Sequence, residues 1–286
     1  MGERVAKAFI YASAFLLIVA TFGIVMMLVK EGIPLFKEVS PLKFLLGKSW
    51  RPTYSPPEFG VLPLVIGTAV VTIGALLVGV PLGLASAIYL AFFSSHRLRN
   101  ALKPILEVLA SIPSVVYGFF GMVVLAPSVK ELFSLPVGLN AFTASIVLGI
   151  MIVPLVGSVA EDAISMVPRE LLEASYALGA TKWRTVMCVV IPTAWSGVFS
   201  SILLGMGRAI GETMTVLMVA GGAAQIPSSI FDPVRTMTAT IAAEMGEAPF
   251  GSLHYHALFA IGMILFFITV LLNFIVERFG KRRTYL

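Results

Sequence analysis

Residues 161–192, EDAISMVPRELLEASYALGATKWRTVMCVVIP, form a polar stretch between two apolar runs that are each long enough to cross a lipid bilayer. Pro168 suits the first turn of a helix, where its missing N–H group is not needed. Gly179 is the residue type that most easily ends a helix in the left-handed conformation, and Thr181 can cap a second helix. The stretch therefore predicts a short helix and the start of another, held between two membrane spans.

The predicted short helix is amphipathic, because small and apolar residues recur at helical spacing on one side while charged residues remain on the other. The side with small and apolar residues consists of Leu171, Ala174, Ser175 and Leu178. A helix of this kind can dock into a groove on a partner protein, or it can lie along the lipid headgroups as a connector. Periodicity alone leaves both interpretations open.

The composition is that of a membrane protein. Hydrophobic residues make up 58% of the chain and charged residues 12%, and the mean hydropathy is +0.97. The net charge of +5 comes from basic residues at the ends of apolar runs, which is a topology signal, so we expect no nucleic-acid partner. Cys188 is the single cysteine, and His254 and His256 do not share a helical face, so we expect neither a disulfide nor a metal site.

Six apolar runs predict an all-α integral membrane protein with about six transmembrane helices. The runs cover residues 8–29, 60–93, 105–127, 139–160, 186–220 and 257–276. The proline-rich residues 30–59 follow the first run and form a polar connector. We therefore divide the chain into residues 1–59, an N-terminal transmembrane helix with an external connector, and residues 60–286, the main transmembrane domain.

Basic residues are more frequent in the connectors on one side of the six predicted spans. That side carries both ends of the chain and residues 161–192, whereas residues 30–59 lie on the other side. Because positively charged connectors tend to remain in the cytoplasm, the sequence predicts a multi-pass plasma-membrane protein with cytoplasmic N and C termini.

Arg208 and Glu212 lie inside the fifth apolar run. An arginine at the centre of a membrane helix costs roughly 2.5 to 3.5 kcal/mol on insertion scales, so it is expected to face water or a partner. The two residues are four positions apart and would share one face of a continuous helix. They could form a private ion pair that holds the bundle together, or Arg208 could offer its planar donors to an oxyanion while Glu212 competes for them. Because intramembrane ionisable residues are functional by default, we interpret the pair as part of a substrate path.

The polar stretch resembles the EAA loop of ABC importer permeases, in which a glutamate–alanine pair, a glycine and a terminal aliphatic–proline pair recur at this spacing. The matching residues are Glu173, Ala174, Gly179, Ile191 and Pro192, and Ser175 stands where the family usually has alanine. The resemblance implies a type I ABC importer permease fold. It also implies that a coupling helix in this loop sits in a groove of a cytoplasmic ATPase subunit. The residues assigned to that coupling are Pro168, Leu171, Glu173, Ala174, Ser175, Leu178 and Gly179.

Two intramembrane segments narrow the resemblance to phosphate-import permeases of the PstC type. They are residues 207–221, GRAIGETMTVLMVAG, and residues 112–119, IPSVVYGF. Gly222 departs from the pattern, since an asparagine often ends the first motif. The resemblance implies that Arg208 and Glu212 take part in phosphate passage.

The resemblance also implies the partners of the chain. These are a second related permease subunit, a dimer of ATPase subunits, an external phosphate-binding protein, inorganic phosphate and the lipid bilayer. The chain itself is expected to hold no cofactor and to catalyse no reaction, because ATP and Mg²⁺ would bind to the ATPase. Three alternatives stay open: a permease for sulfate or molybdate, a stand-alone secondary transporter, and a membrane-embedded enzyme.

Overall fold

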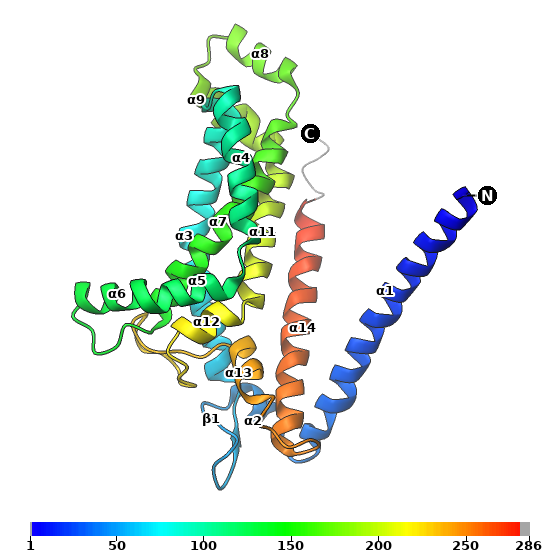
Figure 1. Cartoon of the computed structure of the whole chain (residues 1–286), viewed down its shortest axis with the longest axis vertical. Coiled ribbons are helices and arrows are strands. Elements are labelled where there is room, and N and C mark those ends of the chain that lie inside the picture. Colours follow the sequence, from blue (N-terminus) through cyan, green and yellow to red (C-terminus); the bar gives the residue numbers. More distant parts are fainter. Residues whose placement is uncertain (1, 281–286) are drawn as a thin grey trace.

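The computed structural model describes residues 2–280, most of which are helical (Figure 1). Four long helices run roughly along the long axis of the molecule and form its centre: α3 (Leu62–Ile88), α7 (Ala141–Ser165), α11 (Trp195–Gly211) and α14 (Leu253–Gly280). The closest pair is α3 and α7. Their backbones approach at Gly79, where any side chain would lie within 2.7 Å of the Gly149 carbonyl oxygen, and Leu148 and Ile152 of α7 are fully buried in the adjoining core.

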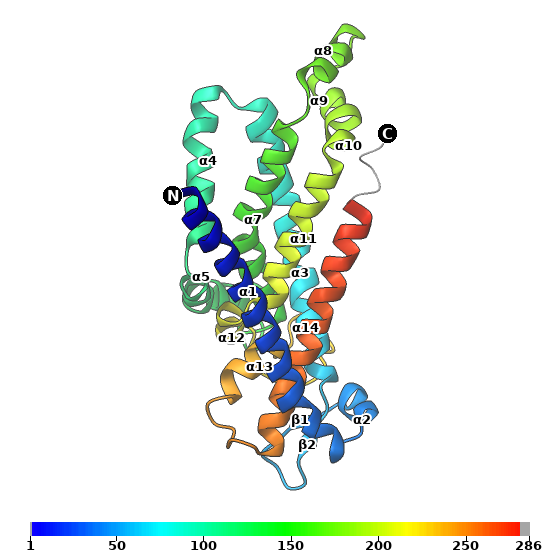
Figure 2. The same ribbon diagram turned by 90° about the vertical axis from the view of Figure 1, so that its right-hand side faces the viewer.

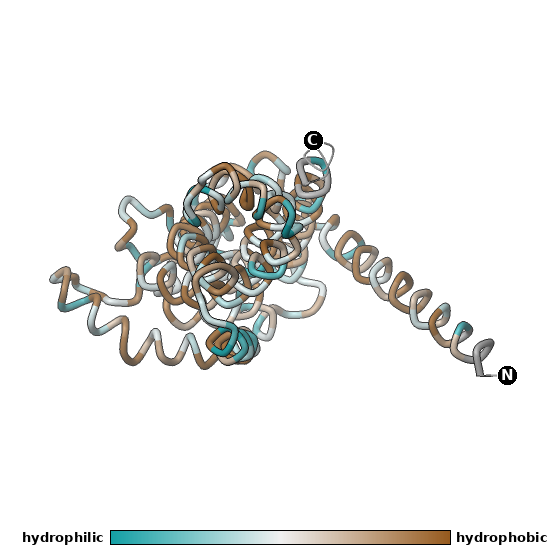
Figure 3. Tube along the Cα trace, turned by 90° about the horizontal axis from the view of Figure 1, so that it is seen from above, coloured by the Kyte–Doolittle hydropathy of each residue, from teal (hydrophilic) through white to brown (hydrophobic). Residues whose placement is uncertain are grey.

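Helix α1 (Gly2–Gly32) leaves this bundle and extends away from it (Figures 1 and 3). It meets α14 near its C-terminal end, where the His256 ring nitrogen Nδ1 lies 2.7 Å from the Glu31 carbonyl oxygen. The most apolar window of the candidate span Phe9–Lys37 has no residue buried within the chain. A helix that is apolar all round suits lipid or the apolar surface of another membrane subunit.

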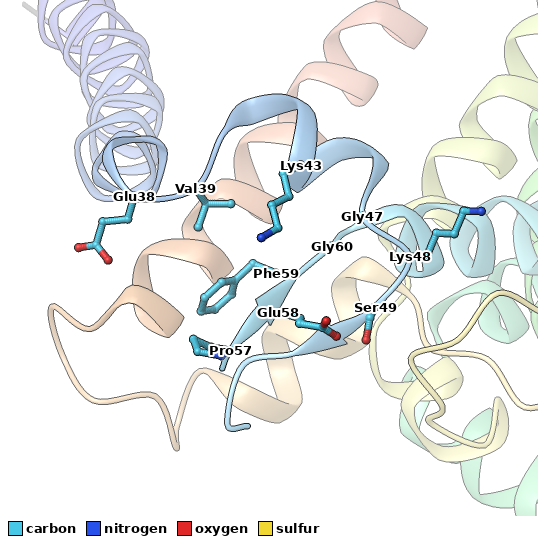
Figure 4. Close-up of a pocket in the computed structure, with 10 residues that line it drawn as sticks. All are labelled: Glu38, Val39, Lys43, Gly47, Lys48, Ser49, Pro57, Glu58, Phe59 and Gly60. Atoms are coloured by element: carbon cyan, nitrogen blue, oxygen red, sulfur yellow. The ribbon is translucent and has the colours of Figure 1, made fainter. Parts of the chain in front are cut away.

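One end of the molecule, which we name the hairpin end, carries the segment between α1 and α3. It contains the 3₁₀ turn η1 (Ile33–Lys37), helix α2 (Pro41–Leu46), and strands β1 (Trp50–Arg51) and β2 (Glu58–Phe59), which pair antiparallel. Leu35, Phe44 and Leu258 are buried together here, so the segment packs against the start of α14. A small hollow of about 130 Å³ lies between α2 and the hairpin and is lined by Lys43, Lys48 and Glu58 among other residues (Figure 4).

The opposite end, which we name the α8 end, carries helix α8 (Arg169–Ala177) at its tip (Figures 1 and 2). Helix α9 (Lys182–Thr185), the π-helical turn η4 (Val186–Val190) and the short helix α10 (Ile191–Thr193) lead back from this tip into the bundle. At Ala194 the direction of the chain changes by 77° before α11 begins.

The predicted number of spans is confirmed. Within residues 2–280, five helices are long and apolar enough to cross a membrane, and a sixth span results when the bent pair around Ala194 is counted as one. The five are Phe9–Lys37, Leu62–Phe93, Ser114–Leu132, Ala141–Ser165 and Leu253–Ile275.

The predicted third span, residues 105–127, is wrong in its bounds. Residues 105–111 end helix α4 (His96–Ser111), and Ile112 and Pro113 are extended. The apolar segment that follows is α5 (Ser114–Phe120), the π-helical turn η3 (Gly121–Leu125) and α6 (Ala126–Leu132). The helix ends before Pro113 because proline disfavours helical geometry in the residue before it. Both views show the segment lying across the bundle axis, whereas α4 runs along it (Figures 1 and 2).

The predicted fifth span, residues 186–220, is not one continuous helix. Besides the bend at Ala194, α11 ends at Gly211, Glu212 is extended, and a separate helix α12 (Met214–Val219) follows. The chain then runs through residues 220–236 to helix α13 (Met237–Glu244), which packs against α14 and α3.

Candidate functional site

The loop after α7, which we name the coupling loop after its predicted role, contains an exposed short helix, α8, as the sequence predicts. Pro168 is the residue before the first turn of α8 rather than within it. Leu178 ends the helix with 89% of its surface exposed, and Gly179 follows with a φ of +79°. The first residues of the predicted loop, 161–165, form the last turn of α7, so the polar loop proper begins at Met166.

One predicted coupling residue, Ser175, points inward. It is 9% exposed, and its hydroxyl lies 2.9 Å from the hydroxyl of Thr185 on α9. Leu171, Glu173 and Ala174 are exposed. Serine in place of the alanine usual at this position therefore adds a polar contact between α8 and α9, and the outward face of α8 remains exposed.

Arg208 and Glu212 lie together at the end of α11. Arg208 Nη2 and Glu212 Oε2 are 3.9 Å apart, and the two side chains are 48% and 5% exposed. The predicted common helical face is wrong, because α11 ends at Gly211 and Glu212 belongs to the break before α12. The pair thus combines a half-exposed guanidinium with a buried carboxylate at a helix break.

Two threonines hold Glu212 in this break. The backbone N–H of Thr215 donates to Glu212 Oε1 at 3.1 Å, and the hydroxyl of Thr238 on α13 donates to the Glu212 carbonyl oxygen at 2.7 Å. The Thr215 hydroxyl also donates to the Ser114 carbonyl oxygen at 2.9 Å. Because Ser114 begins α5 and Thr215 lies in α12, the two sequence motifs that were recognised separately meet beside Glu212.

The sequence analysis missed a cluster of charged and polar residues between α4 and α7. It consists of Arg99 and Lys103 on α4 and Glu161, Asp162 and Ser165 on α7. Glu161 is 1% exposed, and Lys103 Nζ lies 2.7 Å from its Oε2. Partial burial would lower the pKa of Lys103, but hydrogen bonds to Asp162 and Glu161 and the charges of both carboxylates outweigh it and raise that pKa. The signal in the sequence was the four-residue spacing of Arg99 with Lys103 and of Glu161 with Ser165.

A second polar cluster, at the hairpin end, gathers around Glu244, the last residue of α13. Its carboxylate accepts hydrogen bonds from Trp50 Nε1 at 3.0 Å and Arg235 Nη1 at 2.6 Å, and His254 Nε2 lies 2.8 Å away. These contacts join the hairpin, α13 and the start of α14. No local pattern could have indicated them, because Trp50 and Glu244 are 194 residues apart.

The loop between α12 and α13 depends on glycine and aspartate. Gly221 and Gly222 have φ values of +87° and +70°. Glycine adopts such values without strain, and asparagine tolerates them better than most other residues. Either residue therefore suits position 222. Asp232 accepts hydrogen bonds from the hydroxyl and N–H of Ser228 and the N–H of Ser229. These hydrogen bonds hold the pKa of Asp232 below its ordinary value of 3.8.

Among the residues that the structure describes, no group of three His, Cys, Asp or Glu side chains is placed to hold a metal ion. At the α11–α12 break, the side chains supply a guanidinium, a carboxylate and hydroxyl groups.

Comparison with known proteins gives the family. The family model described as binding-protein-dependent transport system inner membrane component matches residues 79–285. A probable ABC transporter permease protein of Bacillus subtilis, YqgH, is 37% identical over 99% of this chain and 92% of its own length. The phosphate transport system permease protein PstC of Mesorhizobium japonicum is 38% identical over 80% of this chain and 75% of its own length. That of Haemophilus influenzae is 36% identical over 80% and 77%.

Solved structures agree on the fold. The crystal structure of a bacterial alginate ABC transporter, in complex with a pentasaccharide-bound periplasmic protein, aligns with a TM-score of 0.64 at 14% identity and covers 96% of each chain. The inward-facing MetNI methionine ABC transporter aligns with a TM-score of 0.57 at 19% identity, covering 78% of this chain and 93% of the other. The chain therefore belongs to the family of binding-protein-dependent transport system inner membrane components and is a PstC-type ABC importer permease with the type I fold.

Proposed function

We propose that the chain is the permease subunit of an ATP-driven phosphate importer and that Arg208 and Glu212 line its substrate path. The observation that carries the proposal is the pairing of a half-exposed Arg208 with a buried Glu212 at a helix break. The sequence relationship to permeases named for phosphate transport supports the same cargo.

The geometry suits an exchange of partners at Arg208. A separation of 3.9 Å to Glu212 leaves the guanidinium without a short ion pair there, whereas Glu212 keeps its hydrogen bond from Thr215. An arriving phosphate would accept paired hydrogen bonds from the planar guanidinium, which binds such oxyanions in bidentate fashion. When the phosphate leaves, Arg208 would again pair with Glu212.

The partners follow from the same proposal. Exposed α8 would dock into an ATPase subunit that binds ATP and Mg²⁺, while this chain would hold no cofactor and catalyse no reaction. A second related permease subunit would complete the membrane path, and an external phosphate-binding protein would meet the hairpin end. The N and C termini would lie in the cytoplasm with α8, and ATP-driven closure would switch the path from outward to inward access.

A second oxyanion is the main competing cargo, because the name of the Bacillus subtilis relative states no substrate. Sulfate and molybdate also present oxygens that an arginine can bind. A stand-alone secondary transporter and a membrane-embedded enzyme lose their support, since the chain belongs to an ABC permease family.

The test is ATP-dependent uptake of radiolabelled phosphate into vesicles that contain the reconstituted complex, with sulfate and molybdate as competitors. We expect Arg208→Gln to lower uptake about tenfold or more, because a charge-assisted hydrogen bond contributes roughly 1.5 to 3 kcal/mol. Arg97→Gln is the matched control, since Arg97 is an exposed arginine outside the path. Normal uptake by Arg208→Gln would remove the pair from the path, and equal competition by sulfate or molybdate would overturn the assignment of phosphate.

A further inference from the structure

Helix α4 is held to the rest of the chain in an unusual way. None of its side chains, all of which the structure describes, is buried, and those that are half-buried are Arg99, Leu102, Lys103 and Leu106. Its position therefore rests on few apolar contacts. It nevertheless packs beside α7, and Figure 2 shows it at the edge of the bundle. Something other than a hydrophobic core must fix it there.

The cluster of Arg99, Lys103, Glu161, Asp162 and Ser165 supplies that attachment. Both carboxylate oxygens of Glu161 are occupied, because Arg99 and Ser165 donate to Oε1 and Lys103 donates to Oε2. Lys103 also donates to Asp162. Since Glu161 is 1% exposed, losing its cationic partners would leave a buried charge unpaired, which is strongly unfavourable. The cluster therefore fixes α4 to one place on α7.

That place lies next to the coupling loop. Helix α7 ends at Ser165, and Pro168 already precedes the first turn of α8. A displacement of α8 would therefore move the end of α7. Because the charged cluster connects α7 to α4, α4 would move with it.

The other end of α4 leads to the substrate path. Ile112 and Pro113 join α4 to α5, and the Tyr117 hydroxyl donates to the Leu109 carbonyl oxygen at 3.0 Å across this junction. The extended dipeptide contains a proline with a fixed φ, and the hydrogen bond braces it. The backbone between the two helices is therefore conformationally restricted.

Helix α5 in turn packs against α12, which carries the support for Glu212. At Gly118 the helices are so close that a side chain would lie 3.1 Å from the Thr215 Cα atom. The Thr215 hydroxyl bonds to the Ser114 carbonyl oxygen, and the Thr215 N–H bonds to Glu212. A shift of α5 must consequently move or break the contacts that position Glu212.

We propose that α4 is a lever that carries movement of the coupling loop to the substrate path, and that Arg99, Lys103, Glu161 and Asp162 are the positioning residues that grip it. The inference rests on the proposed function. It adds a second route between the coupling loop and Glu212 besides the direct one through α9, α10 and α11. We predict that weakening these contacts lowers the amount of phosphate transported per ATP hydrolysed.

The experiment uses the complete complex in vesicles and measures phosphate taken up per ATP hydrolysed. We expect Lys103→Gln to lower this ratio about fivefold or more, in the range typical of coupling between sites. Lys103→Arg, which keeps the charge, should restore most of it, and the exposed neighbour Arg97→Gln should leave it unchanged. If Lys103→Gln prevents assembly, Asp162→Asn replaces it, because this half-exposed carboxylate also contacts Lys103.

A second readout does not depend on the cargo. Val116 of α5 is 54% exposed, so Val116→Cys in a Cys188→Ser background reports movement of α5 by its rate of reaction with a thiol reagent. ATP should change that rate in the otherwise unaltered complex and should change it much less with Lys103→Gln, because only the direct route through α9, α10 and α11 then remains. An unchanged transport ratio, or a response to ATP of unchanged size, would overturn the lever. If the complex carries sulfate instead, the proposed cargo fails while this readout still decides the lever.

Discussion

At the scale of single residues, the most connected side chain of the hairpin end is Glu244. It is 14% exposed and pairs with Arg235, which is 27% exposed, and with His254, which is 12% exposed. Trp50, which is 4% exposed, donates its indole N–H to the same carboxylate. One carboxylate therefore joins three segments of the chain, which are the hairpin, the loop before α13 and the start of α14.

Replacing this carboxylate should destabilise the hairpin end. We expect Glu244→Ala to lower the free energy of unfolding by about 2 to 3 kcal/mol, because it leaves a partly buried guanidinium and a buried indole N–H without their acceptor. Thermal unfolding of the purified protein in detergent measures the change. Glu247→Ala is the control, since Glu247 is exposed and lies three residues further on. Equal losses in both variants would mean that the contacts of Glu244 add nothing specific.

Arg208 and Glu212 show where residue-level reasoning from the sequence stops. The two residue types in an apolar run were enough to identify the pair, because their cost in a membrane depends on chemistry alone. Their geometry was not accessible, since the break at Glu212 is stabilised by Thr238, 26 residues away, and its neighbour Thr215 bonds to Ser114, 101 residues away. A helical pattern reports contacts between near neighbours only.

At the scale of elements, α8 depends on a single conformational requirement. Gly179 has a φ of +79°, and apart from its chain neighbours no described residue has an atom within 4 Å of the position that a side chain would occupy. A substitution there is therefore unfavourable because of the backbone and not because of crowding.

Gly179→Ala should consequently fray the end of α8 without disturbing its neighbours. The left-handed conformation costs about 1 to 2 kcal/mol for a residue with a side chain, which corresponds to roughly 5- to 30-fold faster amide exchange at this helix end. Hydrogen exchange measured by mass spectrometry on the peptide that contains α8 tests this. Gly246→Ala is the comparison, because that glycine has equal space and an ordinary φ. No change in exchange with Gly179→Ala would show that the loop adopts another conformation.

The elements themselves were predicted unequally. Helix α8 and the spans α3, α7 and α14 follow from local periodicity, from Gly179 and from runs of apolar residues. Helix α4 was divided between a loop and a span, because its charged residues look like a connector until Glu161 and Asp162 of α7 are placed beside them. The crosswise direction of α5 to α6 depends on packing against α12, which the sequence pattern does not contain.

At the scale of the whole molecule, polar and apolar surfaces are arranged along one axis. The hairpin end and the α8 end lie at opposite ends of the helices that form the bundle (Figures 1 and 2). Between them the candidate spans expose apolar side chains, including Phe22 of α1 and Leu77 of α3. A bilayer around this middle region would leave the two polar ends in water on opposite sides.

This arrangement predicts opposite labelling of two introduced cysteines in intact cells. Tyr54, which is 65% exposed, lies between the two strands of the hairpin, and Leu178, which is 89% exposed, ends α8. In a Cys188→Ser background, we expect an impermeant maleimide to label Tyr54→Cys from outside and to label Leu178→Cys only after the membrane is opened, because the excess of basic residues on the α8 side favours the cytoplasm. Labelling of both from outside would contradict a membrane between the two ends. Labelling of Leu178→Cys alone would reverse the orientation, and α8 could not then reach a cytoplasmic ATPase.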